Sequence, residues 1–72
     1  MRTKLNRSTI RLLARIRKWL IDEEKTELSK KRKLSLRLTK KKIDSILNIG
    51  YYNDDEREFL NGLRERYINN TK

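Results

Sequence analysis

Residues 8–21 form the longest run of apolar residues at helical spacing in the chain. At about 100° per residue, eight apolar side chains fall on one arc about 200° wide. They are Ile10, Leu12, Leu13, Ala14, Ile16, Trp19, Leu20 and Ile21. A helix that is apolar over more than half of its circumference has to be covered on two or more sides. The segment therefore predicts a central helix with other elements packed around it.

The opposite arc of the same helix, about 80° wide, is entirely basic. Its members are Arg7, Arg11, Arg15 and Lys18. They recur at steps of four, four and three residues, which makes a ridge about 16 Å long at 1.5 Å per residue. Arginine suits phosphate because its planar guanidinium donates two parallel hydrogen bonds. The ridge predicts an anionic partner.

Acidic residues at 22–24 indicate a break near Asp22. Carboxylates are unfavourable at the C-terminus of a helix and favourable in a first turn, so Asp22 is a candidate cap for a second helix. Residues 23–38 are compatible with a helix or an ordered loop. Leu34, Leu36 and Leu38 also alternate as a strand would, but no second alternating run is present to pair with them. We therefore expect no strand here.

A short helix is predicted at residues 39–49. Thr39 can cap its N-terminus, and Gly50 follows it where a left-handed residue ends many helices. Lysines 40–42 would then occupy the first turn, where cations oppose the helix dipole by roughly 0.3 to 1 kcal/mol. That cost favours a role for these lysines besides folding, although a solvated charge run is an equal alternative.

The last helix is predicted at residues 54–68. Asn53 and Glu56 have the spacing of a capping box, which gives this helix a well-defined start. The four-residue connection to the preceding helix predicts an antiparallel helical hairpin. With the helix at residues 8–21 as a third member, the fold class is all-α, a small bundle of three or four short helices.

The length of 72 residues suits a single helical domain over residues 1–72. Residues 1–7 are expected to be a flexible basic arm, and residues 69–72 a tail. No apolar run approaches the roughly 20 residues that span a bilayer, and no signal-peptide core follows the N-terminus, so a cytoplasmic location is the default.

The net charge of +10 is unevenly placed along the chain. Residues 1–42 carry sixteen Lys and Arg against four acids, whereas residues 43–72 carry four against six. A basic run at residues 30–33, Arg37 and the lysines at 40–42 could extend the surface begun by the ridge. Such segregation favours an anionic partner over a general contribution to solubility.

Several kinds of chemistry lack the residues they need. The chain has no cysteine and no histidine, which removes thiol nucleophiles, disulfides, Cys/His metal sites and imidazole acid–base catalysis. It also has no glycine-rich phosphate loop and no nucleophile elbow. We therefore expect no enzyme activity, no cofactor and no metal site.

The pattern predicts non-catalytic binding of DNA or RNA through the phosphate backbone, dependent on structure more than on base sequence. In size, richness in lysine and asparagine, and lack of cysteine, the chain resembles small accessory proteins of large phages, some of which act in nucleic-acid metabolism or bind host machinery. Two alternatives remain, which are docking on an acidic protein partner and binding to a membrane surface. The predicted nucleic-acid contacts are Arg7, Arg11, Arg15, Lys18, Lys31, Arg32, Lys41 and Lys42.

Overall fold

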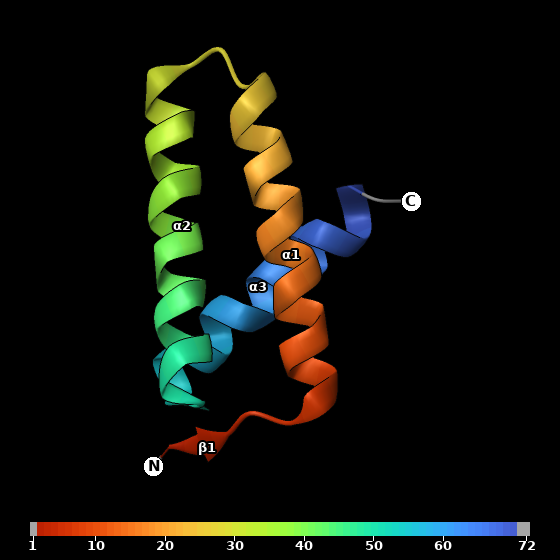
Figure 1. Ribbon diagram of the computed structural model, residues 1–72, viewed down its shortest axis with the longest axis vertical. Helices are drawn as coiled ribbons and strands as arrows, with labels where there is room; N and C mark the ends of the chain where they lie inside the picture. The colour runs from red at the N-terminus through yellow and green to blue at the C-terminus, as the bar shows by residue number, and fades with distance from the viewer. Residues whose placement is uncertain (1, 71–72) are drawn as a thin grey trace.

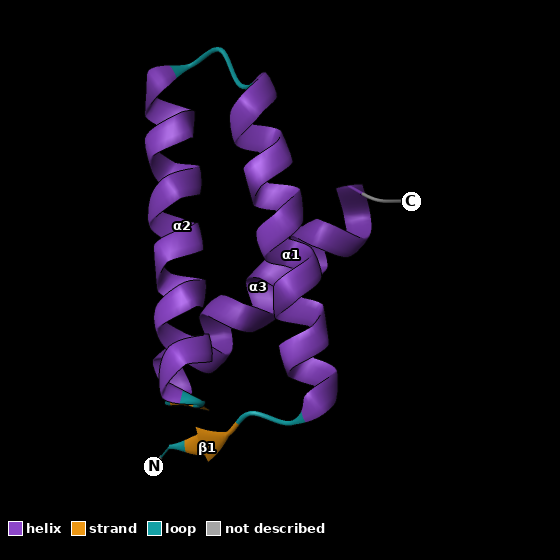
Figure 2. Ribbon diagram, viewed as in Figure 1, coloured by secondary structure: helices purple, strands orange, loops and turns teal. Residues whose placement is uncertain are grey.

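A computed structural model describes residues 2–70, and helices make up nearly all of this range (Figure 2). The elements in chain order are β1 (Thr3–Lys4), α1 (Arg7–Thr26), α2 (Lys30–Ile49), β2 (Tyr51–Tyr52) and α3 (Asp54–Asn70). Helices α1 and α2 run antiparallel side by side, and α3 crosses behind them (Figure 1). The predicted all-α class is confirmed, with three helices and one two-stranded antiparallel pair in the described range.

Helix α1 has a side-chain cap at its N-terminus and ends later than predicted. The Asn6 side chain accepts a hydrogen bond of 2.8 Å from the backbone N–H of Thr9. The helix then continues through Asp22 to Thr26, so the predicted break at Asp22 is wrong. Of the acids at residues 22–24, Glu24 has a partner on α2, with 2.5 Å between Glu24 Oε1 and Arg37 Nε. This pair offsets part of the unfavourable position of Glu24 in its own helix.

Helix α2 is one uninterrupted helix and begins nine residues before the predicted start at Thr39. Ser29 is its cap, and the Thr39 hydroxyl donates to the backbone oxygen of Ser35 within the helix at 2.8 Å. Residues 30–38 are therefore helical, because a capping serine precedes them and no Gly or Pro interrupts them. Gly50 ends α2 in the left-handed conformation, with φ of 84°, as predicted.

Helix α3 begins at the predicted capping box. The Asn53 N–H donates to Glu56 Oε1 at 2.9 Å, and the Glu56 N–H donates to Asn53 Oδ1 at 2.8 Å. The helix extends to Asn70, so the first half of the predicted tail at 69–72 is helical, and residues 71 and 72 lie outside the described range. The antiparallel neighbours in Figure 1 are α1 and α2, whereas α3 crosses them, so the predicted antiparallel hairpin of the last two helices is not confirmed.

The N-terminal arm is held in place over its described residues. Thr3 and Lys4 pair with Tyr52 and Tyr51, and the Leu5 N–H donates to the backbone oxygen of Gly50 at 2.9 Å. Leu5 is only 6% exposed. Within the arm expected to be flexible at residues 1–7, residues 3–5 thus have specific contacts, and Arg7 is the first residue of α1. Burial of Leu5 and the backbone hydrogen bonds to residues 50–52 oppose free movement of this segment.

The core lies where the three helices and the arm meet. Its buried members are Leu5, Leu13, Ile16, Leu20, Ile43, Ile46, Leu60 and Leu63. The predicted apolar arc of α1 is buried at its centre, and Leu12 and Trp19 pack against the core from its edge. Ile10 and Ala14 are exposed, because α2 and α3 do not reach that side of α1.

Candidate functional site

The basic ridge predicted on α1 is exposed along its whole length. Arg7, Arg11, Arg15 and Lys18 are all exposed. By helical geometry, their mean direction lies about 180° around α1 from the buried Leu13, Ile16 and Leu20. The ridge thus points straight away from the core, where it takes no part in folding contacts.

Helix α3 turns one flank of this ridge into a groove. Three ridge residues, Arg7, Arg11 and Arg15, line an open depression of about 710 Å³ together with Arg64 of α3. Its remaining lining consists of apolar and small hydroxyl side chains, namely Ser8, Thr9, Leu12, Tyr67 and Ile68. Four guanidinium groups and no carboxylate therefore surround the depression.

Two smaller hollows continue this depression at its ends. One, of about 220 Å³, shares Thr9, Leu12 and Arg64 with it and adds Arg57 of α3. The other, of about 230 Å³, shares Arg15 and Tyr67 and adds Lys18, Trp19 and Asp22. We refer to the three together as the α1–α3 groove. Its cationic lining is Arg7, Arg11, Arg15, Lys18, Arg57 and Arg64.

None of the six groove cations takes part in an ion pair among the described residues. The three ion pairs within residues 2–70 involve other arginines and lie between α1 and α2 or at their connection: Arg17–Asp44 at 2.6 Å, Arg37–Glu24 at 2.5 Å and Arg32–Glu27 at 3.7 Å. No groove cation has a carboxylate within 4.0 Å in the described part of the chain. Asp22 is the one carboxylate among the described lining residues, so the groove carries a large excess of positive charge.

The predicted contacts on α2 lie elsewhere. Lys31 and Lys41 are exposed, and the Lys42 ammonium lies 4.4 Å from the centre of the Phe59 ring, on the side facing α3. Lys41 points about 170° away from the buried Ile43 and Ile46 around the helix. Because the core lies between α1 and α2, Lys41 and the ridge face opposite sides of the molecule. The eight predicted residues thus do not form one surface, and only the four on α1 are brought together.

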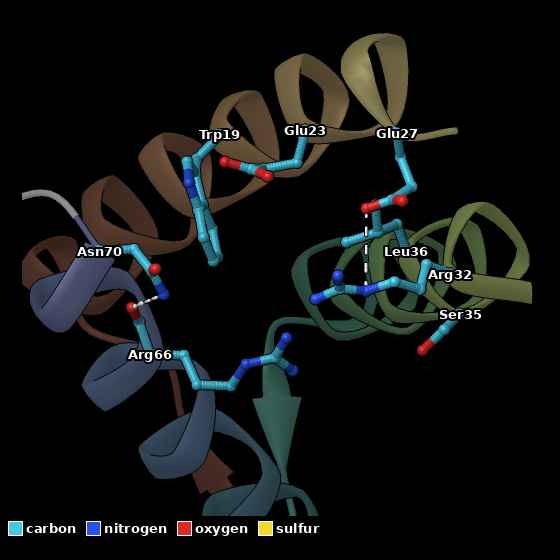
Figure 3. A pocket seen from close by; sticks show the side chains of 8 residues that line it. All are labelled: Trp19, Glu23, Glu27, Arg32, Ser35, Leu36, Arg66 and Asn70. Atoms are coloured by element: carbon cyan, nitrogen blue, oxygen red, sulfur yellow. Dashed lines mark hydrogen bonds and ion pairs between the residues drawn. The ribbon is translucent and has the colours of Figure 1, made fainter. Parts of the chain in front are cut away.

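Arg32, the remaining predicted contact, lines a separate small hollow between the three helices (Figure 3). Its guanidinium pairs with Glu27, while Arg66 extends into the hollow from α3 beneath Trp19 (Figure 3). Glu23 also lines this hollow, so its charges are mixed. The volume of about 120 Å³ is below the roughly 300 to 1,000 Å³ that is usual for small-molecule sites.

Trp19 stands between this hollow and the end of the groove and lines both. Its ring meets that of Tyr67 edge-on, with centroids 5.7 Å apart and an interplanar angle of 68°. Both rings are half-buried and pack against the core. The tryptophan therefore has a structural role in joining α1 to α3, and one edge of it remains at the groove.

The sequence interpretation missed Arg57 and Arg64. A signal was present, because seven residues are close to two helical turns and both side chains fall on one face of the last helix. The net negative charge of residues 43–72 obscured it. Neither arginine could be connected with the ridge until the crossing of α3 over α1 was known.

Within residues 2–70, no cluster of three or more acidic side chains could hold a metal ion. No helix in the same range is long and apolar enough to cross a membrane. Comparisons with protein-family models, with curated proteins and with solved structures found no match to this chain.

Proposed function

We propose that the protein binds DNA or RNA without catalysis and holds a sugar–phosphate strand in the α1–α3 groove. The observation that supports this proposal is the set of six cations that line one groove, where Asp22 at one end is the one carboxylate of the described lining and forms no ion pair with them. Uncompensated cations on a folded surface attract polyanions and release their condensed counterions on binding.

The spacing of the groove cations fits a repeating anion. Successive ridge residues are about 5 to 6 Å apart along α1, and the ridge of about 16 Å corresponds to about five steps of a duplex strand at 3.4 Å each. Five of the six cations are arginines, which bind phosphate through two parallel hydrogen bonds. Backbone contacts of this kind fix position without reading base sequence, so recognition of nucleic-acid structure is the expected mode.

The two alternatives use less of the observed geometry. An acidic protein could also bind the groove through the same charges. The regular spacing of the arginines along α1 has no counterpart in that alternative, whereas it matches the repeating phosphates of a strand. Membrane binding through α1 would need its apolar arc, and the centre of that arc is buried in the core.

A salt-dependent titration of duplex, branched and single-stranded oligonucleotides tests the proposal. With five or six phosphates neutralised, log K against log salt has an expected slope near −5 for duplex, at about −0.9 per contact. A single strand would give about −4, at about −0.7 per contact. Absence of binding at low salt to all three forms would refute nucleic-acid binding.

Two pairs of charge reversals locate the site. Arg11→Glu with Arg15→Glu should bring the duplex slope to about −3, since each phosphate contact contributes about one unit. Lys31→Glu with Lys41→Glu applies the same charge change to α2 and should reduce the slope by less than about one unit. Equal losses from both pairs would point to net charge alone, and a loss confined to the second pair would move the site to α2.

A further inference from the structure

The outer side of α2 carries apolar side chains that no other described element covers. Leu34 and Leu38 lie one turn apart and are 57% and 58% exposed, and Ile49 at the end of the helix is 50% exposed. They fall within about 60° of one another around the helix. Ile43 and Ile46, on average about 120° away around the helix, are fully buried. The packing of α2 onto α1 and α3 therefore uses one side of α2 and leaves the two leucines in solvent.

These residues belong to a stripe that runs along the helix at steps of three and four. We define the α2 outer stripe as Lys31, Leu34, Leu38, Lys41, Ser45 and Ile49, all of which are exposed. Such spacing keeps one narrow line of side chains on one side of a helix, as in the seam between two paired helices. The stripe is thus shaped to lie along another rod-like element.

The charge around the stripe is of one sign. Lys31 and Lys41 lie within it, and Lys42 flanks it toward α3. The only acid among residues 30–49 is Asp44, which pairs with Arg17 of α1 at 2.6 Å on a different side of α2. A partner that covers the leucines must therefore meet the lysines with carboxylates.

We propose that the α2 outer stripe docks an acidic amphipathic helix of a partner protein. The leucines supply apolar contact, and the lysines select a helix with Glu or Asp beside its own apolar seam. This surface faces away from the α1–α3 groove, so the interaction is separate from the proposed binding of nucleic acid and either can fail alone.

Two other occupants fit the stripe less well. A lipid surface favours a broad apolar face with aromatic residues, whereas this stripe is one residue wide and is interrupted by Lys31, Lys41 and Ser45. A second copy of the chain would place lysines opposite lysines.

The test uses two designed three-heptad peptides with the same leucine seam, one with glutamates beside the seam and one with lysines. Binding of each labelled peptide to the full chain is measured by fluorescence anisotropy, with vesicles of a zwitterionic and an anionic phospholipid as a separate probe. The glutamate peptide should bind at least about tenfold more tightly than the lysine peptide. Leu34→Ala with Leu38→Ala should weaken it by about tenfold or more, since both leucines are already half exposed in the free protein.

Ile10→Ala is the matched control, because Ile10 is 43% exposed on α1 away from the stripe, and it should leave peptide binding unchanged. Lys31→Glu with Lys41→Glu should weaken the glutamate peptide and strengthen the lysine peptide. No binding of either peptide, or equal binding of both, overturns the proposal. The proposal is also overturned if the Arg11→Glu, Arg15→Glu protein loses peptide binding while the Leu34→Ala, Leu38→Ala protein keeps it. Binding to anionic vesicles that depends on Leu34 and Leu38 would assign the stripe to a membrane instead.

Discussion

Two leucines outside the helices have opposite environments. Leu5 is 6% exposed and belongs to the core, and its N–H donates to Gly50. Leu28 is 95% exposed in the connection between α1 and α2. It precedes the cap Ser29, a position from which an apolar residue often packs on the fourth residue of the helix. That residue is Lys33, so Leu28 has no apolar partner there.

The same substitution at these two residues should therefore give very different results. Leu5→Ala is expected to lower the free energy of unfolding by about 2 to 5 kcal/mol, because it removes a buried side chain and leaves a cavity. Leu28→Ala should change it by less than about 0.5 kcal/mol. Urea denaturation followed by circular dichroism measures both. Similar values for the two variants would show that the arm does not pack as described.

At the scale of elements, the ends of α1 and α2 carry charges that oppose their own dipoles. Glu23 and Glu24 lie in the last turn of α1, and residues 30–33 place four cations in the first turn of α2. Each arrangement costs roughly 0.3 to 1 kcal/mol per charge within its own helix. The antiparallel pairing brings the two ends together, so the acids of one lie near the bases of the other. The Arg37–Glu24 pair joins the two helices here, and Arg32 in the first turn of α2 pairs with Glu27 in the connection.

Lys30 is the first residue of α2 and has no ion pair in the described range. Lys30→Glu should therefore raise the free energy of unfolding by about 0.3 to 1 kcal/mol at low salt, since it replaces an unfavourable charge at the positive end of the dipole. The gain should fall as salt is added. Lys41→Glu, in the middle of the helix, is the control without a dipole effect. If Lys30→Glu lowers the free energy of unfolding and Lys41→Glu does not, attraction between Lys30 and the acids of α1 outweighs the dipole effect.

Signals confined to a few neighbouring residues predicted this fold well. The capping box at Asn53 and the helix end at Gly50 depend on local backbone geometry, and both are confirmed. The breaks expected at Asp22 and Thr39 are wrong because contacts between helices decide those positions. An acid that looks like a helix start can lie inside a helix when an arginine from a distant segment is near.

The candidate site was predictable to the same extent. The four ridge residues on α1 follow from helical spacing alone, and the structure places them together in solvent. Their association with Arg57 and Arg64 depends on how α3 crosses α1, which no local pattern records. The α2 residues were grouped with the ridge by sequence proximity, and the antiparallel packing of α1 and α2 separates them.

At the scale of the whole molecule, some cations form ion pairs between α1 and α2, and those of the α1–α3 groove form none with the described residues. All three ion pairs of residues 2–70 join α1 or its connection to α2, and the α1–α3 groove has none. With a net charge of +10 on 72 residues, repulsion among the unpaired cations opposes the compact state. Any polyanion bound in the groove would relieve that repulsion and stabilise the fold through linkage.

Salt should consequently act in opposite directions on folding and on binding. Raising the concentration of NaCl from a low value should increase the melting temperature of the free protein, because screening weakens repulsion among cations that have no partner. The same increase should reduce affinity for oligonucleotides, because counterions released into a more concentrated salt solution gain less entropy. At low salt, a saturating duplex at about 100 times its Kd should add about 2.7 kcal/mol to the free energy of unfolding. Circular dichroism melts with and without duplex, in the buffers used for the titrations, measure all three effects. A melting temperature that falls with salt would mean that the Arg17–Asp44 pair and its neighbours outweigh the repulsion, which would remove the energetic link between the groove and the fold.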